Sequence, residues 1–212
     1  MKSAFVATAA LLAGSAGAST IYSNGSVNGT IASFAIDDGT AVADSFTVSS
    51  NTSAWDLTFG TDNYGSAKLK SVNWAIYNGN PFTGTPTLIG SGTATPGVTF
   101  LFTNGSGYSL YDNTISLGGV PLTSGTYWIE LSGAVAGSGG GTPFWDDNNG
   151  ASSAWQGGAG GTGDLTNFSG LTGNNSEAFS IGTPEPATWA LMLAGFAGLG
   201  AALRGRRRLA TA

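Results

Sequence analysis

The stretch AVADSFTVS at residues 41–49 alternates in the way that a β-strand with one buried face requires. Large apolar and small polar side chains occupy opposite parities: Val42, Phe46 and Val48 on one, Ser45, Thr47 and Ser49 on the other. Because successive side chains of a strand point to opposite faces, the first set shares one face. This stretch therefore predicts a strand whose apolar face packs on a core.

The same alternation recurs at short intervals along the middle of the chain. Clear candidates lie at 55–59, 72–76 and 127–131, and weaker ones at 87–90, 98–102, 108–117 and 178–181. Turn signals such as Asn78-Gly79-Asn80-Pro81 separate these runs. Eight or nine short strands with this spacing predict an all-β domain, a jelly-roll-like β-sandwich.

The composition agrees with strands and turns and excludes several kinds of chemistry. Glycine accounts for 35 of 212 residues, and there is no cysteine and no histidine. Disulfides, Ser-His-Asp and Cys-His catalytic sites and zinc sites built on His or Cys are therefore excluded. Between residues 19 and 182 only Lys68 and Lys70 are basic, against eleven carboxylates. An acidic surface is predicted, which argues against nucleic acid as a partner.

The candidate site lies between two glycine-rich runs, 137–141 and 157–163, that are expected to be surface loops. It consists of Trp145, Asp146, Asp147, Asn148, Asn149 and Trp155. Three interpretations stay open. The segment is a turn with its tryptophans packed on the sandwich, a calcium loop that uses carboxylate and amide oxygens, or a tryptophan platform for a sugar. The spacing is not that of an EF-hand, so the metal is unknown.

Paired carboxylates are the remaining route to catalysis. A glycosidase needs two acids about 5 to 9.5 Å apart across a cleft. Glu130 is predicted to point away from the core, and Asp146 and Asp147 are neighbours that rarely face one substrate together. We therefore expect a non-catalytic protein without a required cofactor. The alternative is an extracellular enzyme that acts on glycans with carboxylates alone.

The N-terminus has the three parts of a secretory signal peptide. Lys2 is followed by an apolar run at 4–13 and by the small residues Ala16-Gly17-Ala18. Cleavage after Ala18 is predicted. This leaves residues 1–18 as the signal peptide and 19–182 as an exported ectodomain of one domain's length.

The C-terminal segment, residues 183–212, also has three parts in a fixed order. The tripeptide Pro184-Glu185-Pro186 comes first, and an uncharged apolar run at 187–203 follows. Its 17 residues are at the short end for a membrane-spanning helix. A basic cluster then ends the chain: Arg204, Arg206, Arg207 and Arg208. By the positive-inside bias these arginines stay cytoplasmic and stop transfer, so the ectodomain lies outside.

This order resembles the PEP-CTERM sorting signal of Gram-negative, exopolysaccharide-producing bacteria. The resemblance implies that an exosortase, a membrane protease-transpeptidase, recognises the tripeptide and processes the tail. It also implies an inner-membrane intermediate followed by release to the cell surface or extracellular matrix. The expected function is that of a matrix-associated protein with exopolysaccharide as a possible partner.

The middle of the chain carries a second, looser resemblance. Four segments, 44–48, 111–117, 125–128 and 145–150, are similar to a β-rich ectodomain that is common among PEP-CTERM proteins. This likeness implies an all-β fold and an exported context, and it implies no activity.

Overall fold

The computed structural model describes residues 19–29, 33–37, 39–65, 67–159, 161–165 and 176–183, together with 195, 196 and 198. The expected signal peptide, the Pro184-Glu185-Pro186 tripeptide and the terminal arginines lie outside these residues. Within the described part, no helix has the length and apolar character needed to cross a membrane. The strands all belong to one compact unit, Thr20–Thr183.

Fourteen strands make up the described part of this unit. They are β1 (Thr20–Ser23), β2 (Ser33–Ala35), β3 (Thr40–Val48), β4 (Thr52–Tyr64), β5 (Leu69–Tyr77), β6 (Leu88–Ala94), β7 (Gly97–Thr103), β8 (Tyr108–Leu122), β9 (Gly125–Ala136), β10 (Pro143–Asn148), β11 (Ala154–Gly158), β12 (Gly163–Asp164), β13 (Ser176–Glu177) and β14 (Phe179–Gly182).

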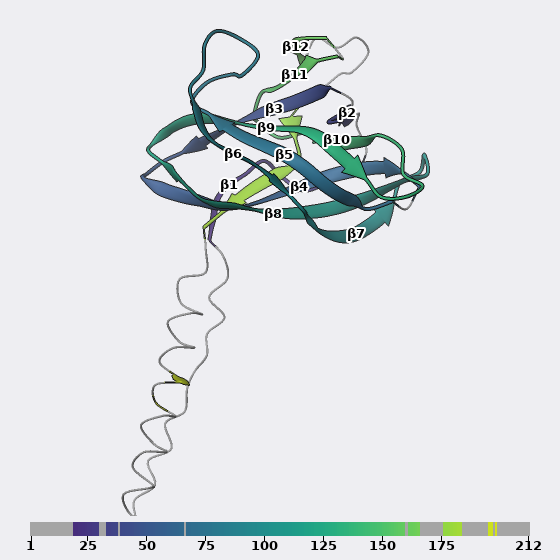
Figure 1. The fold of residues 1–212 in the computed structure, drawn as a ribbon, viewed down its shortest axis with the longest axis horizontal. Coiled ribbons are helices and arrows are strands. Elements are labelled where there is room, and N and C mark those ends of the chain that lie inside the picture. Colours follow the sequence, from purple (N-terminus) through teal and green to yellow (C-terminus); the bar gives the residue numbers. More distant parts are fainter. Residues whose placement is uncertain are drawn as a thin grey trace, which may run out of the picture. The chain divides into compact units, whose positions relative to one another are not determined.

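The strands form two antiparallel sheets that lie one above the other (Figure 1). The six-stranded sheet has the order β12-β11-β3-β9-β5-β6. The eight-stranded sheet is built around β4, which pairs along one edge with β8 and along the other with β14 and β10. Strand β10 also pairs with β2 and β13. The predicted all-β architecture with two sheets is confirmed.

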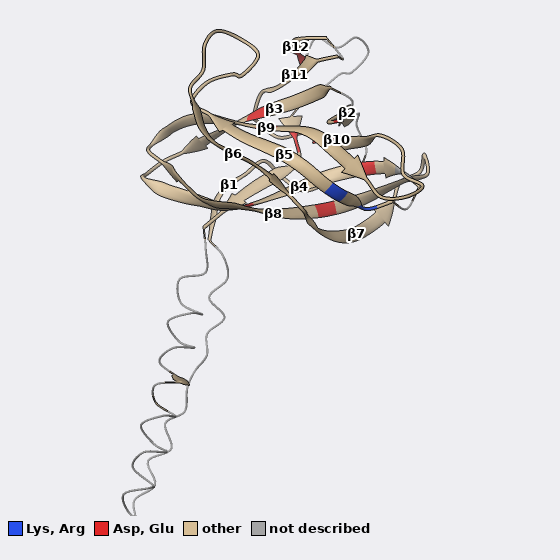
Figure 2. Cartoon of the chain, in the orientation of Figure 1, with Lys and Arg blue, Asp and Glu red and all other residues tan. Residues whose placement is uncertain are grey.

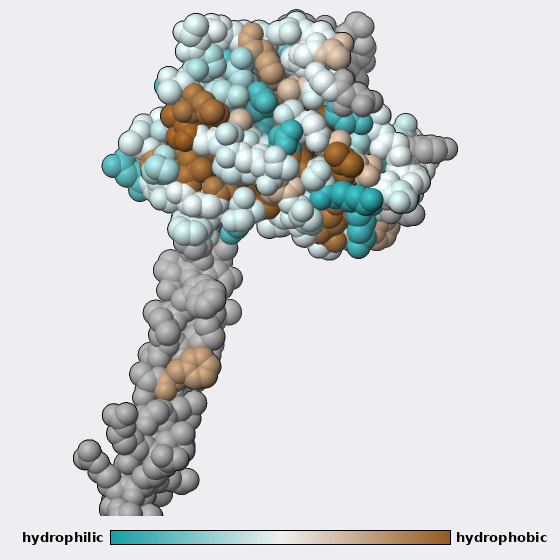
Figure 3. All heavy atoms as spheres, viewed as in Figure 1, coloured by the Kyte–Doolittle hydropathy of each residue, from teal (hydrophilic) through white to brown (hydrophobic). Residues whose placement is uncertain are grey.

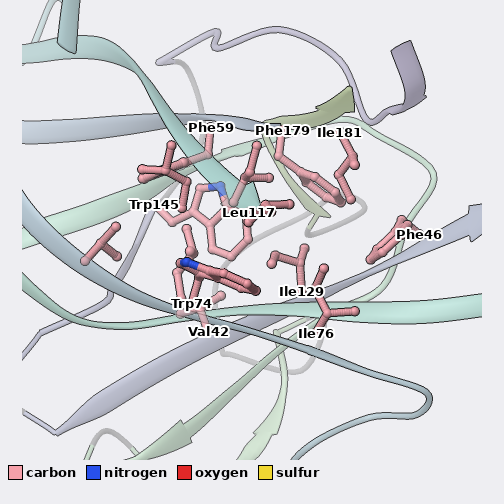
Figure 4. Close-up of a cluster of buried hydrophobic side chains, with 14 of the residues drawn as sticks. Val42, Phe46, Phe59, Trp74, Ile76, Leu117, Ile129, Trp145, Phe179 and Ile181 are labelled. Carbon is pink, nitrogen blue, oxygen red and sulfur yellow. The ribbon is translucent and has the colours of Figure 1, made fainter. Parts of the chain in front are cut away.

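The core lies between the sheets, and both sheets contribute to it (Figure 4). In β3 the predicted parity is confirmed, because Val42, Phe46 and Val48 are all buried. Asp44 stands in the same inward row and is also fully buried. A fully buried carboxylate in an apolar row is the unusual feature of β3.

The second half of the chain has more strands than the sequence pattern predicted. The region around the glycine-rich runs contains β10, β11 and β12, and Gly157 and Gly158 belong to β11 rather than to a loop. Pairing with β3 along five residue pairs holds β11 in place despite its glycines. The expectation of a surface loop is confirmed for 137–141, between β9 and β10, and is wrong for Gly157 and Gly158, because long-range pairing outweighs the weak local preference of glycine for strands.

The charged residues are few on the ribbon of this unit (Figure 2), and many acids are not on its surface. Five of the eleven carboxylates between residues 19 and 182 are buried: Asp44, Asp62, Asp146, Asp147 and Glu177. The surface is therefore less acidic than the composition predicts. The acids collect instead at two buried places on either side of β10.

Candidate functional site

The predicted site residues lie mainly in a strand, not in a loop. Trp145, Asp146, Asp147 and Asn148 belong to β10, Asn149 follows it, and Trp155 is in β11. Because side chains alternate along a strand, Trp145 and Asp147 face the core while Asp146 points to the other side. Strand pairing keeps the backbone extended as far as Asn148, so the expected turn begins only there, where Asn148 Oδ1 accepts a hydrogen bond from the N–H of Gly150 at 2.8 Å.

Trp145 is part of the core and has 0% of its surface exposed. Its ring meets the rings of Phe59 and Phe179 edge-on, with centroids 6.2 and 5.8 Å away (Figure 4). Its indole Nε1 donates a hydrogen bond to the backbone oxygen of Ala178 at 3.1 Å. Trp145 has no face on which a sugar ring can stack, so a sugar platform built on this residue does not form. Trp155 is half-buried in β11.

Three fully buried carboxylates from distant parts of the chain meet at the inner side of β10. We call Asp44 of β3, Asp147 of β10 and Glu177 of β13 the inner acid cluster. Asp147 and Glu177 are directly opposite in the β10–β13 pairing, so their side chains share a face. Asp44 comes from the other sheet, and its Oδ2 accepts a hydrogen bond from the backbone N–H of Glu177 at 2.7 Å.

Within the cluster, Asp44 is the carboxylate with a full set of donors. In addition to the bond from Glu177, Oδ2 accepts from the Ser152 hydroxyl at 2.7 Å and from Asn24 Nδ2 at 3.3 Å. Oδ1 accepts from the backbone N–H of Ser45 at 2.6 Å. The bonds from Ser152 and Glu177 tie β3 to segments more than 100 residues away, so Asp44 is a structural link between the sheets.

The other two acids have oxygens without a hydrogen bond. Asp147 Oδ1 accepts from the backbone N–H of Ser176 at 3.1 Å, but Asp147 Oδ2 accepts none. Both Oε1 and Oε2 of Glu177 are buried and accept no hydrogen bond in the described structure. Unsatisfied buried carboxylate oxygens are costly, and three in one place are unusual in a folded protein.

The electrostatics follow from this burial. Burial raises the pKa of Asp44 to about 7 and that of Asp147 to about 7. Burial and the nearby charges of Asp147 and Asp44 hold the pKa of Glu177 well above its usual range. The described part of the chain has two basic side chains, Lys68 and Lys70, and both are exposed. Neither is buried with the cluster to balance its charge.

A second group of acids lies on the outer side of the eight-stranded sheet. Asp62 accepts from the Ser33 hydroxyl at 2.7 Å, and Asp146 Oδ2 accepts from the backbone N–H of Asn28 at 3.0 Å. Burial raises the pKa of Asp146 to about 6, with smaller contributions from the charges of Asp62 and Asp112. The two aspartates that are adjacent in sequence therefore belong to two different environments.

An open groove of about 570 Å³ lies beside this outer group. We call it the outer groove and define it by Ser26, Thr58, Phe100, Phe102, Asp112 and Ser180. Phe100 and Phe102 on β7 are 52% and 40% exposed; Phe102 pairs with Leu110 on the face of Asp112, whereas Phe100 pairs with Tyr111 on the other face and its ring packs against that of Tyr111. Figure 3, a view of one face of the molecule, shows apolar residues (brown) among paler polar ones. Exposed rings beside hydroxyls and a carboxylate are suited to binding a polar ligand with apolar faces.

Sequence reasoning missed most of these residues. Asp44 and Glu177 are 133 positions apart, and each looks like an ordinary strand residue in its local sequence. Phe100 and Phe102 were predicted only as part of a weak strand. The one available signal was Asp44, a carboxylate in the apolar parity of a clearly alternating strand.

The comparison with known families concerns the end of the chain. Residues 183–208 match the family model for the PEP-CTERM protein-sorting motif. The chain carries a PEP-CTERM sorting motif. The match includes the tripeptide Pro184-Glu185-Pro186 and the arginines from Arg204 to Arg208, as the sequence predicted. The motif implies export and processing at the membrane by an exosortase. No curated protein matches the sequence.

Proposed function

We propose that this PEP-CTERM protein is a non-catalytic component of the cell surface or exopolysaccharide matrix. The sorting motif at residues 183–208 is the observation that carries this proposal, because it directs the chain toward the surface. In the proposed route, a signal peptide at 1–18 is removed after Ala18. A helix at 187–203 then holds an inner-membrane intermediate until the exosortase acts. The exported part is the jelly-roll-like ectodomain, residues 19–182.

The outer groove is the proposed contact with polysaccharide. Sugar rings have apolar faces that stack on aromatic side chains, and their hydroxyls bond to side-chain oxygens. Phe102 supplies the ring, and Thr58, Ser180 and Asp112 supply polar groups. The groove is open rather than closed, which allows a long polymer to pass through it.

The chemistry of the groove favours binding over turnover. Among the described residues that line it, Asp112 is the one carboxylate. Hydrolysis of a glycosidic bond needs a second acid across the scissile bond. The charges of Asp62 and Asp112 both raise the pKa of Asp146, so the three acids are neighbours. Asp62 and Asp146 are buried and do not line the groove. The carboxylate-only enzyme therefore remains the second candidate.

The test is binding of the full chain, purified in a mild detergent, to the exopolysaccharide of its host, measured by calorimetry. We expect saturable binding that weakens at least tenfold in Phe102→Ala and less in Phe100→Ala, whose ring packs on Tyr111 on the other face of β7. Leu88→Ala is the matched control, since Leu88 is equally exposed but lies on β6 of the other sheet. Wild-type protein that does not bind, or binding unaffected by both ring variants, contradicts the proposal.

The enzyme candidate has a separate readout. Release of new reducing ends from the polysaccharide, abolished by Asp112→Asn in a protein that still folds, would establish turnover. We expect no release from the wild-type protein. A positive result would replace the non-catalytic proposal.

A further inference from the structure

We propose that the inner acid cluster is a divalent-cation site, selective for Ca²⁺, with Asp147 and Glu177 as its charged ligands. The site is separate from the outer groove, and the inference does not depend on the proposed function. It also differs from the calcium loop that the sequence left open as one interpretation of residues 145–155, because its ligands come from two paired strands, β10 and β13.

The first support is the set of unsatisfied oxygens. Asp147 Oδ2 and both carboxylate oxygens of Glu177 are buried and accept no hydrogen bond in the described structure. The β10–β13 pairing places Asp147 and Glu177 directly opposite each other, so these three oxygens lie on one face. Asp44 lies next to this strand pair, since its Oδ2 accepts a hydrogen bond from the backbone N–H of Glu177. Buried acceptors on one face that lack donors are what a cation requires.

The second support is the absence of a protein group that can balance the charge. The two basic side chains in the described part, Lys68 and Lys70, are exposed. The cluster is therefore neutralised either by protons or by a bound cation. The carboxylates do not stay ionised without a compensating charge, because burying such a charge costs too much free energy.

The donor chemistry favours Ca²⁺ over other ions. Every group is an oxygen, which suits the hard cations Ca²⁺ and Mg²⁺ and not zinc or copper. Mg²⁺ keeps several of its waters, whereas Ca²⁺ accepts six to eight protein oxygens in a flexible geometry. All three carboxylates are fully buried, which leaves little space for retained water. Ca²⁺ therefore fits this site better.

The ligand set does not consist of acids alone. Among the described residues, no three His, Cys, Asp or Glu groups are arranged as a ready metal-binding group. Asp44 is already occupied by four hydrogen bonds, so it positions the backbone of Glu177 and does not act as a ligand. Asp147 and Glu177 then supply the charge, and neutral oxygens complete the shell. Ser176 and Asn148, the adjacent side chains on the two strands, alternate to the opposite face and hydrogen-bond to each other at 2.9 Å, so backbone carbonyl oxygens are the source of these neutral ligands.

The experiment uses the full chain in detergent at pH 7.5, first stripped with EGTA. Thermal unfolding is then followed in EGTA, in 1 mM Ca²⁺ and in 1 mM Mg²⁺. We expect Ca²⁺ to raise the melting temperature by several degrees and Mg²⁺ to have a smaller effect, because a ligand that binds only the folded state stabilises it. Calorimetric titration gives the affinity for Ca²⁺.

Two variants and a control locate the site. Glu177→Gln and Asp147→Asn keep size and shape but remove charge, and each should weaken Ca²⁺ binding at least tenfold. Asp56→Asn removes a partly exposed carboxylate from the outward face of β4 and should bind Ca²⁺ like the wild type. In EGTA, Glu177→Gln should melt no lower than the wild type, because an unpaired acid has been removed.

A measurement on the unaltered protein keeps the inference testable if a variant does not fold. Tb³⁺ takes calcium sites and emits when a nearby tryptophan is excited. Trp145 shares a face with Asp147, two residues away on β10. We expect emission that Ca²⁺ displaces. A wild-type melting temperature that is the same in Ca²⁺ and EGTA, with no tryptophan-sensitised emission, would show that protons neutralise the cluster. Wild-type affinity in Glu177→Gln would equally overturn the assignment.

Discussion

Replacing Trp145 with alanine tests whether this residue belongs to the core or to a binding surface. The side chain is fully buried against Phe59 and Phe179. A buried Trp→Ala change costs about 3–5 kcal/mol, because apolar contact is lost and a cavity remains. The lost hydrogen bond adds little, since the backbone oxygen of Ala178 still accepts from the N–H of Gly60 at 2.9 Å. That oxygen is not left without a partner.

This cost is a large part of the total stability. Domains of this size are stable by about 5–15 kcal/mol. Each kcal/mol lowers the melting temperature of a 150–250-residue protein by about 2–4 °C. We therefore expect Trp145→Ala to lower the melting temperature by about 6–20 °C. Trp145→Phe keeps a ring in the core and should cost about 1–2 kcal/mol, from the indole hydrogen bond and the smaller volume.

The assay is thermal unfolding by circular dichroism, in EGTA so that cations do not contribute. Trp55→Ala is the matched control, because Trp55 is 40% exposed and its removal should change stability by less than about 1 kcal/mol. A Trp145→Ala protein that melts within 2 °C of the wild type would refute the core assignment. Equal losses in the two variants would do the same.

Two further predictions concern the tail and the buried acids. The intact mass of the native protein should show a chain that ends near residues 184–187. Glu185→Ala should block this processing. A mature form that keeps Arg206–Arg208 contradicts exosortase cleavage. In EGTA the folded state should lose stability as the pH rises from about 4 toward 7. Between the ordinary pKa of 3.8 and the folded pKa of about 7, Asp44 and Asp147 bind protons in the folded state but not in the unfolded one. Urea unfolding across this pH range measures the effect, and a flat profile would mean that both acids stay ionised.

The sequence was a good guide wherever a strand has one apolar and one polar face. The parities of 41–49 and 127–131 predicted the inward residues of β3 and β9, because the period of two is a property of the backbone itself. Val42 and Ile129, for example, are fully buried as expected. The pairing order of the strands and their distribution over two sheets did not follow from these local patterns.

The candidate site shows the limit of predicting structure from local residue preferences. Asp146-Asp147-Asn148-Asn149-Gly150 has the residues of a turn, and local preference alone predicts one. Its first three residues become the end of β10 because β2 pairs with Asp146 and β13 pairs with Asp147 and Asn148. Once it is a strand, its two aspartates must face opposite ways. One acidic pair in the sequence therefore becomes part of two separate buried groups.

The proposed Ca²⁺ site at the inner acid cluster should fill only after the protein has been exported. Two charged ligands completed by neutral oxygens make a weak calcium site, and extracellular modules bind Ca²⁺ at about 10⁻⁴–10⁻³ M. Such a site fills only where Ca²⁺ is abundant. The Trp145 packing and the outer groove do not use Asp147 or Glu177, so the sandwich can form before the ion binds. Binding then ties β10 and β13 together at the inner acid cluster, and we expect this tightening to occur after the chain has left the cytoplasm.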